Sequence, residues 1–287
     1  MSTIKASATR HPALAYYALA FAISWGGVLI VVGPSGIPGT SDEVERLMPY
    51  AILAFAIGPA LAGPLSTGFV YGKAGVREFL SRLLKWRVAG CWYAVALLTA
   101  PLLMTAVLLA LSLFSREFVP AIFTSHDKAT LVLVGIATAL AAGFFEELGW
   151  TGFAIPTLRQ HHGVLSTGLI AGVLWGAWHL LVYFWTSGTV SGALSLTGYL
   201  LDAFLFLTLF RVLMVWVYDR TGSLLVAMFM HGSLTASARI LMPPGTAGMR
   251  LLTFDLVWVA ALCVAIAAVA LANSGQLSRR PLQKRMA

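Results

Sequence analysis

Charged side chains are scarce in this sequence. Asp, Glu, Lys and Arg together make up 10% of the 287 residues, whereas hydrophobic residues make up 59%. A soluble domain carries about 25% charged residues. This chain therefore has too little charge to cover a water-facing surface, which excludes an ordinary soluble protein and indicates a chain that folds within a membrane.

Cysteine is nearly absent, and several common motifs are missing altogether. The two cysteines, Cys91 and Cys263, lie at or in apolar segments and give neither a disulfide framework nor a zinc-site spacing. The sequence has no His-Glu-x-x-His motif, in which two histidines on one helix face bind zinc. We also find no internal repeat and no low-complexity segment. These absences exclude repeat architectures and leave a metal site without support from spacing.

Long apolar segments are what the sequence does contain. Each is close to the roughly 20 residues that a helix needs to cross a bilayer. We predict an all-α, polytopic membrane protein, one domain over residues 1–287, with eight spanning helices at about 13–33, 49–71, 91–114, 129–147, 164–185, 196–217, 223–241 and 252–273. The first segment follows Lys5 and Arg10 but lacks a clear small-residue cleavage site, so we expect a retained helix and not a signal peptide.

Two features modify this simple bundle. Gly58-Pro59 and Gly63-Pro64 interrupt the second segment, so we expect a kink there, with small residues that allow close helix contact. Residues 75–86 place Val76, Phe79 and Leu80 at helical spacing, with Arg77, Arg82 and Lys85 on another face. This pattern predicts an amphipathic helix that lies on the anionic membrane surface, with a peptide-binding element as the alternative.

The basic residues indicate an orientation. Of the 19 Lys and Arg residues, 14, including Arg211, fall on one side of the predicted helices; the other five are Arg46, Arg116, Lys128, Arg239 and Arg250. By the positive-inside rule we expect both termini in the cytoplasm and the protein in the plasma membrane. We interpret the net charge of +8 as a topology signal, so we expect contact with membrane lipids and no nucleic-acid partner.

Two adjacent carboxylates, Glu146 and Glu147, close an apolar run that holds no other charge. A charged side chain at bilayer depth costs about 2.5–3.5 kcal/mol, so a function is expected to offset it. Neighbouring helical residues point about 100° apart, so one carboxylate can face a cavity while the other faces a neighbouring helix. A carboxylate in a poorly hydrated site suits a general base that acts on water. The alternative is a helix end that merely reaches headgroup water.

Two histidines also lie in apolar surroundings, His179 in GVLWGAWHLLVYFW and His231 in MFMHGSLTAS. Thr235 follows His231 by four residues, so both share a helix face. Each histidine alone could be a helix-packing residue. Three intramembrane polar positions in three helices favour one shared site. We interpret Trp175 and Trp178 as packing residues, and Asp202 as either a satisfied inward acid or a partner of the site.

These residues resemble the three motifs of the CAAX protease and bacteriocin-processing (Abi) family of intramembrane peptidases, which includes the type II CAAX prenyl proteases. In this chain, Glu146–Phe153 resembles the first motif, Trp175–His179 the second and His231–Thr235 the third. The resemblance covers about residues 54–237. Two positions depart from it. The first motif usually has arginine where this chain has Thr151, and the third usually ends in asparagine where it has Thr235.

The resemblance implies an eight-helix bundle with a cavity open to membrane and cytosol, and an endopeptidase activity. Glu146 with His179 would activate water, His231 with Thr235 would stabilise the oxyanion, and Glu147 would orient its neighbours. The substrate would be a membrane-associated peptide or a lipidated protein. Glu146, His179 and His231 are also the candidate ligands of a zinc ion, so a zinc mechanism and a metal-independent glutamate mechanism both stay open. A proton-coupled transporter and a non-catalytic immunity or scaffold protein are the alternative functions.

Overall fold

The computed structural model describes residues 9–33, 35–187, 193–273 and 277–278. Within these ranges all the regular secondary structure is helical, and eight helices are long and apolar enough to cross a membrane, which confirms the predicted fold class. The spans are α2 (Pro12–Val32), α3 (Ser41–Leu83), α4 (Gly90–Ser112), α6 (Lys128–Glu147) with η2 (Trp150–Ala154) and α7 (Ile155–Leu158), α8 (Val164–Thr186), α9 (Ala193–Leu201) with η4 (Asp202–Phe206) and α10 (Leu207–Thr221), α11 (Leu224–Leu241) and α12 (Met249–Ala272). Two short helices, η1 (Arg116–Phe118) and α5 (Ala121–Thr124), join α4 to α6.

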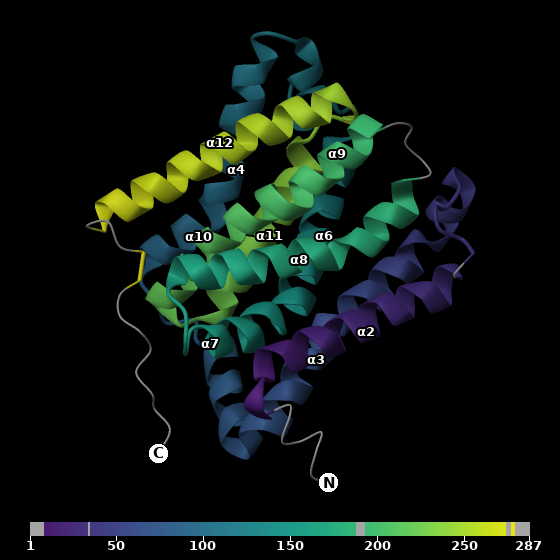
Figure 1. Cartoon of the computed structure of the whole chain (residues 1–287). Helices are drawn as coiled ribbons and strands as arrows, with labels where there is room; N and C mark the ends of the chain where they lie inside the picture. The colour runs from purple at the N-terminus through teal and green to yellow at the C-terminus, as the bar shows by residue number, and fades with distance from the viewer. Residues whose placement is uncertain (1–8, 34, 188–192, 274–276, 279–287) are drawn as a thin grey trace.

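The helices pack as pairs around a shared core (Figure 1). α11 packs against α6 and α4, α8 packs against α10, and α2 pairs with α3. The start of α2 packs near α7, and Ser278 accepts a hydrogen bond from the backbone N–H of Val164 at the start of α8. Both ends of the described chain therefore lie at the same end of the bundle, as an even number of crossings requires. Lys5 and the basic residues after 278 lie outside the described residues.

The predicted bend in the second helix lies further along the chain. α3 stays helical through Pro59 and Pro64, and its one residue with non-helical torsion angles is Gly72, at φ 62° and ψ −154°. The predicted close contact is confirmed. A Cβ atom on Gly58 would lie 1.9 Å from Ser24 Oγ, and one on Gly63 would lie 2.3 Å from Leu148 O. Small residues here let α3 approach both α2 and the end of α6.

The predicted amphipathic helix is the part of α3 that follows Gly72, and its contacts differ from our expectation. Phe79 is buried with Leu224 and Met228. Arg82 donates hydrogen bonds to Tyr218 Oη (2.8 Å) and Gly152 O (3.1 Å), and Lys85 donates one to Thr221 O (2.7 Å). Two of the three cations expected on the lipid surface thus bind backbone and side-chain oxygens of the protein.

A glycine seam joins α8 to the helix formed by η4 and α10. Added Cβ atoms at Gly168, Gly172 and Gly176 would lie 2.6 Å from Val212 Cα, 2.5 Å from Thr208 Cα and 1.8 Å from Ala203 O, respectively. Glycine at every fourth position gives a helix a face without side chains, so the two backbones touch directly. This seam holds the side chains of α8 close to those of α10.

We expect Gly176→Ala to lower the thermal stability of the purified protein, because the added methyl group must displace backbone. Overpacking of this kind costs about 1–3 kcal/mol. Gly26→Ala is the matched control, since no atom lies within 4 Å of its added Cβ and alanine favours a helix over glycine by about 1 kcal/mol. Melting followed by intrinsic fluorescence in detergent checks both variants. Equal melting temperatures for the two would contradict this account of the seam.

Candidate functional site

Glu146 and Glu147 lie at the end of α6, where the α-helix gives way to the π-helix η2. The start of α6 is capped by Asp127, whose carboxylate accepts a hydrogen bond from Thr130 N (2.9 Å); hydrogen bonds from Thr130 lower the pKa of this exposed carboxyl. Glu147 is fully buried and Glu146 is 8% exposed. The two carboxylates point to different neighbours, as expected from their adjacent positions. Neither carboxylate is exposed at the helix end, so the alternative of a helix end that reaches headgroup water does not describe this pair.

Three side chains converge on the carboxylate of Glu147. Arg211 Nη1 lies 2.8 Å from Oε1 and 3.0 Å from Oε2. His231 Nδ1 lies 2.7 Å from Oε1, and the Thr151 hydroxyl donates a short hydrogen bond to Oε2. Thr151 stands where the resembled motif has arginine, so the guanidinium that contacts this carboxylate comes from α10 instead. Both oxygens of the Glu147 carboxylate are thus hydrogen-bonded, as a buried carboxylate needs to be.

Glu146 faces Trp175 and His231. The Trp175 indole donates a hydrogen bond from Nε1 to Glu146 Oε2 at 2.8 Å. His231 Nε2 lies 3.9 Å from the same oxygen, which is beyond direct hydrogen-bond distance. The carboxylate and the imidazole nitrogen therefore face each other without a bond between them. A water molecule that lies to one side of the two atoms can hydrogen-bond to both.

His231 connects the two glutamates. It lies in α11, it is 2% exposed, and its ring packs edge-on to Trp175 with the centroids 5.1 Å apart. Nδ1 contacts Glu147 and Nε2 faces Glu146. Helices α6 and α11 approach closely here, since an added Cβ at Gly143 would lie 2.4 Å from Met228 O. The structure thus brings together three of the predicted site residues, Glu146, Glu147 and His231.

His179 and Thr235 lie beside this group, and within the described chain no hydrogen bond links either to a glutamate. His179 Nδ1 lies 2.8 Å from Trp175 O, and the ring packs against Phe55, Trp175, Trp178 and Tyr183. The Thr235 hydroxyl donates to His231 O at 3.4 Å. Trp175 therefore contacts both residues, His179 through its carbonyl oxygen and Glu146 through its indole N–H. Catalytic roles for His179 and Thr235 stay predictions.

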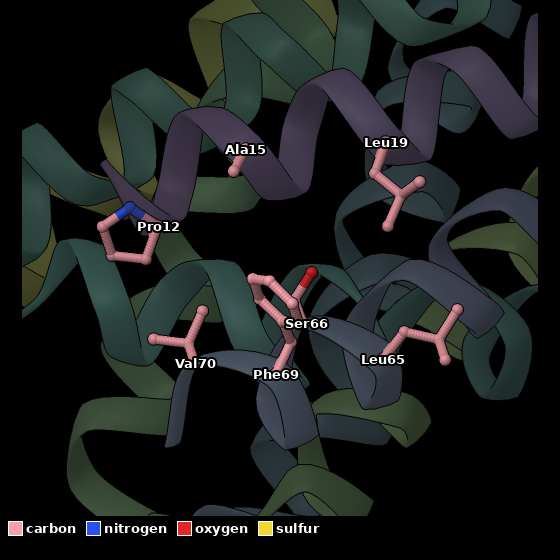
Figure 2. A pocket seen from close by; sticks show the side chains of 7 residues that line it. All are labelled: Pro12, Ala15, Leu19, Leu65, Ser66, Phe69 and Val70. Atoms are coloured by element: carbon pink, nitrogen blue, oxygen red, sulfur yellow. The ribbon is translucent and has the colours of Figure 1, made fainter. Parts of the chain in front are cut away.

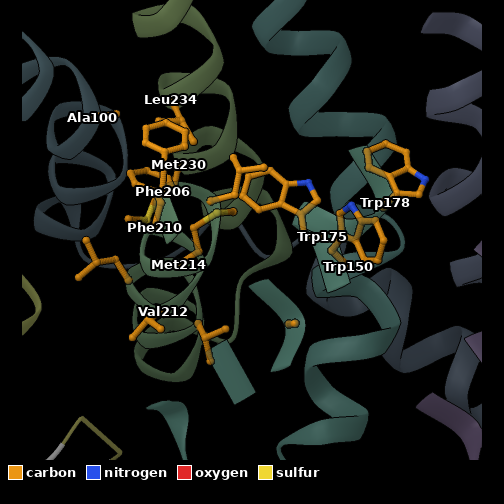
Figure 3. Close-up of a cluster of buried hydrophobic side chains, with 14 of the residues drawn as sticks. Ala100, Trp150, Trp175, Trp178, Phe206, Phe210, Val212, Met214, Met230 and Leu234 are labelled. Carbon is orange, nitrogen blue, oxygen red and sulfur yellow. The ribbon is translucent and has the colours of Figure 1, made fainter. Parts of the chain in front are cut away.

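Sequence reasoning missed two members of the site. Arg211 was placed among the cytoplasmic charges, but it is fully buried and its guanidinium lies 4.0 Å from the ring centre of Trp175. Trp175 was expected only to pack, yet its indole also binds Glu146. Trp178 does pack, stacked on Phe55 with the ring centres 3.5 Å apart. Figure 3 shows Trp175 next to the apolar side chains of α10 and α11, with Trp150 and Trp178 together on its other side. The available signal for Arg211 was a lone charge inside an apolar segment.

The candidate metal ligands do not converge in the described part of the chain. No group of three or more His, Cys, Asp or Glu side chains there is placed to hold a metal ion. His231 Nδ1 is hydrogen-bonded to Glu147, and His179 Nδ1 is hydrogen-bonded to the carbonyl oxygen of Trp175. Glu146, His179 and His231 thus do not form a common coordination site in this arrangement.

Two other features lie outside this group. Asp202 accepts a short hydrogen bond from the Tyr183 hydroxyl, so it is a satisfied, inward-facing acid. An apolar pocket of about 310 Å³ lies between α2 and α3, lined by Pro12, Ala15, Leu19, Leu65, Ser66, Phe69 and Val70 (Figure 2). None of the glutamate and histidine residues of the site lines this pocket.

Comparison with known proteins points to one family. Residues 128–237 match the model of the Rce1-like type II CAAX prenyl endopeptidases, and this range contains Glu146, Glu147, His179, Arg211 and His231. A stretch of 71 residues is 31% identical to CAAX prenyl protease 2 of Methanococcus maripaludis; it covers 25% of this chain and 21% of that protein. The chain thus spans about a fifth of the length of the curated relative that it matches.

Proposed function

Residues 128–237 carry the domain of the Rce1-like type II CAAX prenyl endopeptidase family, and we propose that the chain is an intramembrane endopeptidase. It hydrolyses a peptide bond of a membrane-associated peptide or a lipidated protein. The observation that carries this proposal is the 3.9 Å gap between Glu146 Oε2 and His231 Nε2. It sets a carboxylate opposite an imidazole deep in an apolar bundle.

The proposed reaction uses a water molecule held at this gap. Glu146 takes a proton from the water, and the oxygen attacks the carbonyl carbon of the scissile bond. His231, with Nδ1 held by Glu147, donates from Nε2 to the oxyanion of the tetrahedral intermediate when its ring is charged. The C–N bond then breaks, and the leaving nitrogen takes the proton from Glu146.

His179 and Thr235 take supporting roles in this proposal. His179 Nδ1 is occupied by Trp175 O, which leaves Nε2 as the nitrogen that can contact water or substrate. The Thr235 hydroxyl lies one helical turn beyond His231, and its single proton has to turn away from His231 O to contact the substrate. The whole chain forms one membrane-embedded domain, with both termini on the cytoplasmic side of the plasma membrane.

The test is cleavage by the purified chain in liposomes. Unmodified and C-terminally isoprenylated peptides from a library are incubated with it, and new fragments are identified by mass spectrometry. We expect fragments that depend on the protein. The same liposomes carry a pH-sensitive dye, so proton-coupled transport is measured in parallel. Proton movement without any new fragment would overturn the peptidase proposal in favour of a transporter.

We expect Trp175→Phe to lower cleavage about tenfold. The substitution removes the N–H that binds Glu146 and keeps an aromatic ring beside Arg211. Hydrogen bonds to charged groups contribute about 1.5–3 kcal/mol, and part of that is recovered by water. Trp216→Phe in α10 is the control, since the Trp216 ring packs on Trp92 and its indole N–H has no hydrogen-bond partner among the described residues. Initial rates on one peptide check both, and equal rates would remove Trp175 from the site.

A further inference from the structure

Arg211 is a fully buried arginine in α10, which is part of an apolar membrane-spanning helix. Its guanidinium lies over the ring of Trp175 and binds both oxygens of Glu147 through Nη1. The other two nitrogens, Nε and Nη2, have no hydrogen-bond partner among the described residues. A buried cation with unpaired donors is unfavourable, so packing alone does not explain the presence of an arginine at this position. Its hydrogen bonds go to one group, the carboxylate of Glu147.

We propose that Arg211 is a positioning residue that keeps Glu147 ionised and thereby fixes a proton on Nδ1 of His231. An ionised carboxylate accepts hydrogen bonds and donates none. Arg211 and Thr151 donate to it, so the 2.7 Å contact with His231 Nδ1 needs a proton on that nitrogen. Nε2 is then the nitrogen that is presented to Glu146.

Loss of the guanidinium reverses this arrangement. A fully buried carboxylate without a counter-charge is relieved by taking up a proton. Protonated Glu147 becomes a donor, and His231 Nδ1 becomes its acceptor. Without an ionised Glu147 to hold a second proton at Nδ1, the ring keeps one proton, on Nε2, and loses the positive charge that the proposed oxyanion contact uses. Arg211 thus acts on the imidazole of His231 through Glu147. The carboxylate of a Ser-His-Asp triad holds the tautomer of its histidine in the same way.

The experiment reads the imidazole directly. The full chain is labelled with ¹⁵N-histidine in lipid bilayers, and the signals of His231 are assigned by their loss in His231→Gln among the six histidines. We compare the wild type with Arg211→Met and Arg211→Lys. Arg159→Met is the matched control, because Arg159 is also buried and paired with an acid, Asp219, away from the site.

We expect a protonated Nδ1 in the wild type, in Arg211→Lys and in Arg159→Met, and its loss in Arg211→Met. An unchanged Nδ1 signal in Arg211→Met overturns the inference. Arg211→Gln, which keeps an N–H but not the charge, serves the same test if Arg211→Met does not fold.

The consequence for cleavage rests on the proposed peptidase function. There we expect kcat to fall about 10–100-fold in Arg211→Met with KM nearly unchanged, which is the range for residues that orient a site ligand, and Arg211→Lys to recover part of the rate. If the wild type cleaves nothing while the Nδ1 signal still depends on Arg211, the proposed function fails and this inference stands. If the wild type cleaves and the signal ignores Arg211, the inference fails alone.

Discussion

Glu146→Gln is expected to lower peptide cleavage by about 10³-fold, within the range of about 10²–10⁴ that a general base contributes. Glutamine matches glutamate in shape and keeps an oxygen that can accept the hydrogen bond from Trp175 Nε1. It cannot take a proton from water. The substitution therefore removes the proposed base and leaves the hydrogen bond between α8 and α6 in place.

The control for this variant is Glu45→Gln, an exposed acid near the start of α3. It should cleave at the wild-type rate. Both variants should elute as the wild type does in size-exclusion chromatography and melt at a similar temperature. A folded Glu146→Gln protein that keeps a tenth or more of the wild-type rate would remove Glu146 from the reaction.

His231→Gln is expected to lower kcat about 10²–10³-fold, which is the usual loss for one oxyanion donor. The imidazole uses one nitrogen for Glu147 and turns the other toward Glu146. A glutamine amide cannot hold both positions with the same geometry or carry a positive charge. Glu147 keeps Arg211 and Thr151 as partners, so the fold should survive the change.

Single-turnover kinetics on the cleaved peptide measure this effect separately from product release. His161→Gln is the matched control, because His161 is exposed in the turn before α8 and should leave kcat unchanged. A folded His231→Gln protein with a rate within threefold of the wild type would end the role proposed for the imidazole.

Hydrophobicity alone was enough to predict the eight spans, because length and apolar content are the properties a bilayer selects. It was less successful with residues 75–86. The periodicity of Phe79 and Leu80 predicts an apolar face, but not which surface covers it. Phe79 meets Leu224 and Met228 from α11, a contact between residues far apart in the sequence. The bend at Gly72 was missed because Pro59 and Pro64 are the stronger local signals.

The site was predicted only in part, for a similar reason. Glu146, Glu147 and His231 are conspicuous because polar groups are costly in a membrane. Arg211 is equally out of place there, but a basic residue near a helix end also fits the positive-inside pattern. The sequence does not contain the contact that decides between these readings, which is the approach of α10 to α8 that sets the guanidinium over Trp175.

The glycine seam between α8 and α10 limits how a substrate can enter. Backbone atoms are in direct contact along the seam, so no side-chain rotation there can open a passage between the two helices. Parting the two helices would also pull Trp175 away from Arg211. For the proposed peptidase, we therefore expect a peptide that arrives from the lipid to pass between another pair of helices to reach Glu146, while α8 and α10 stay in contact.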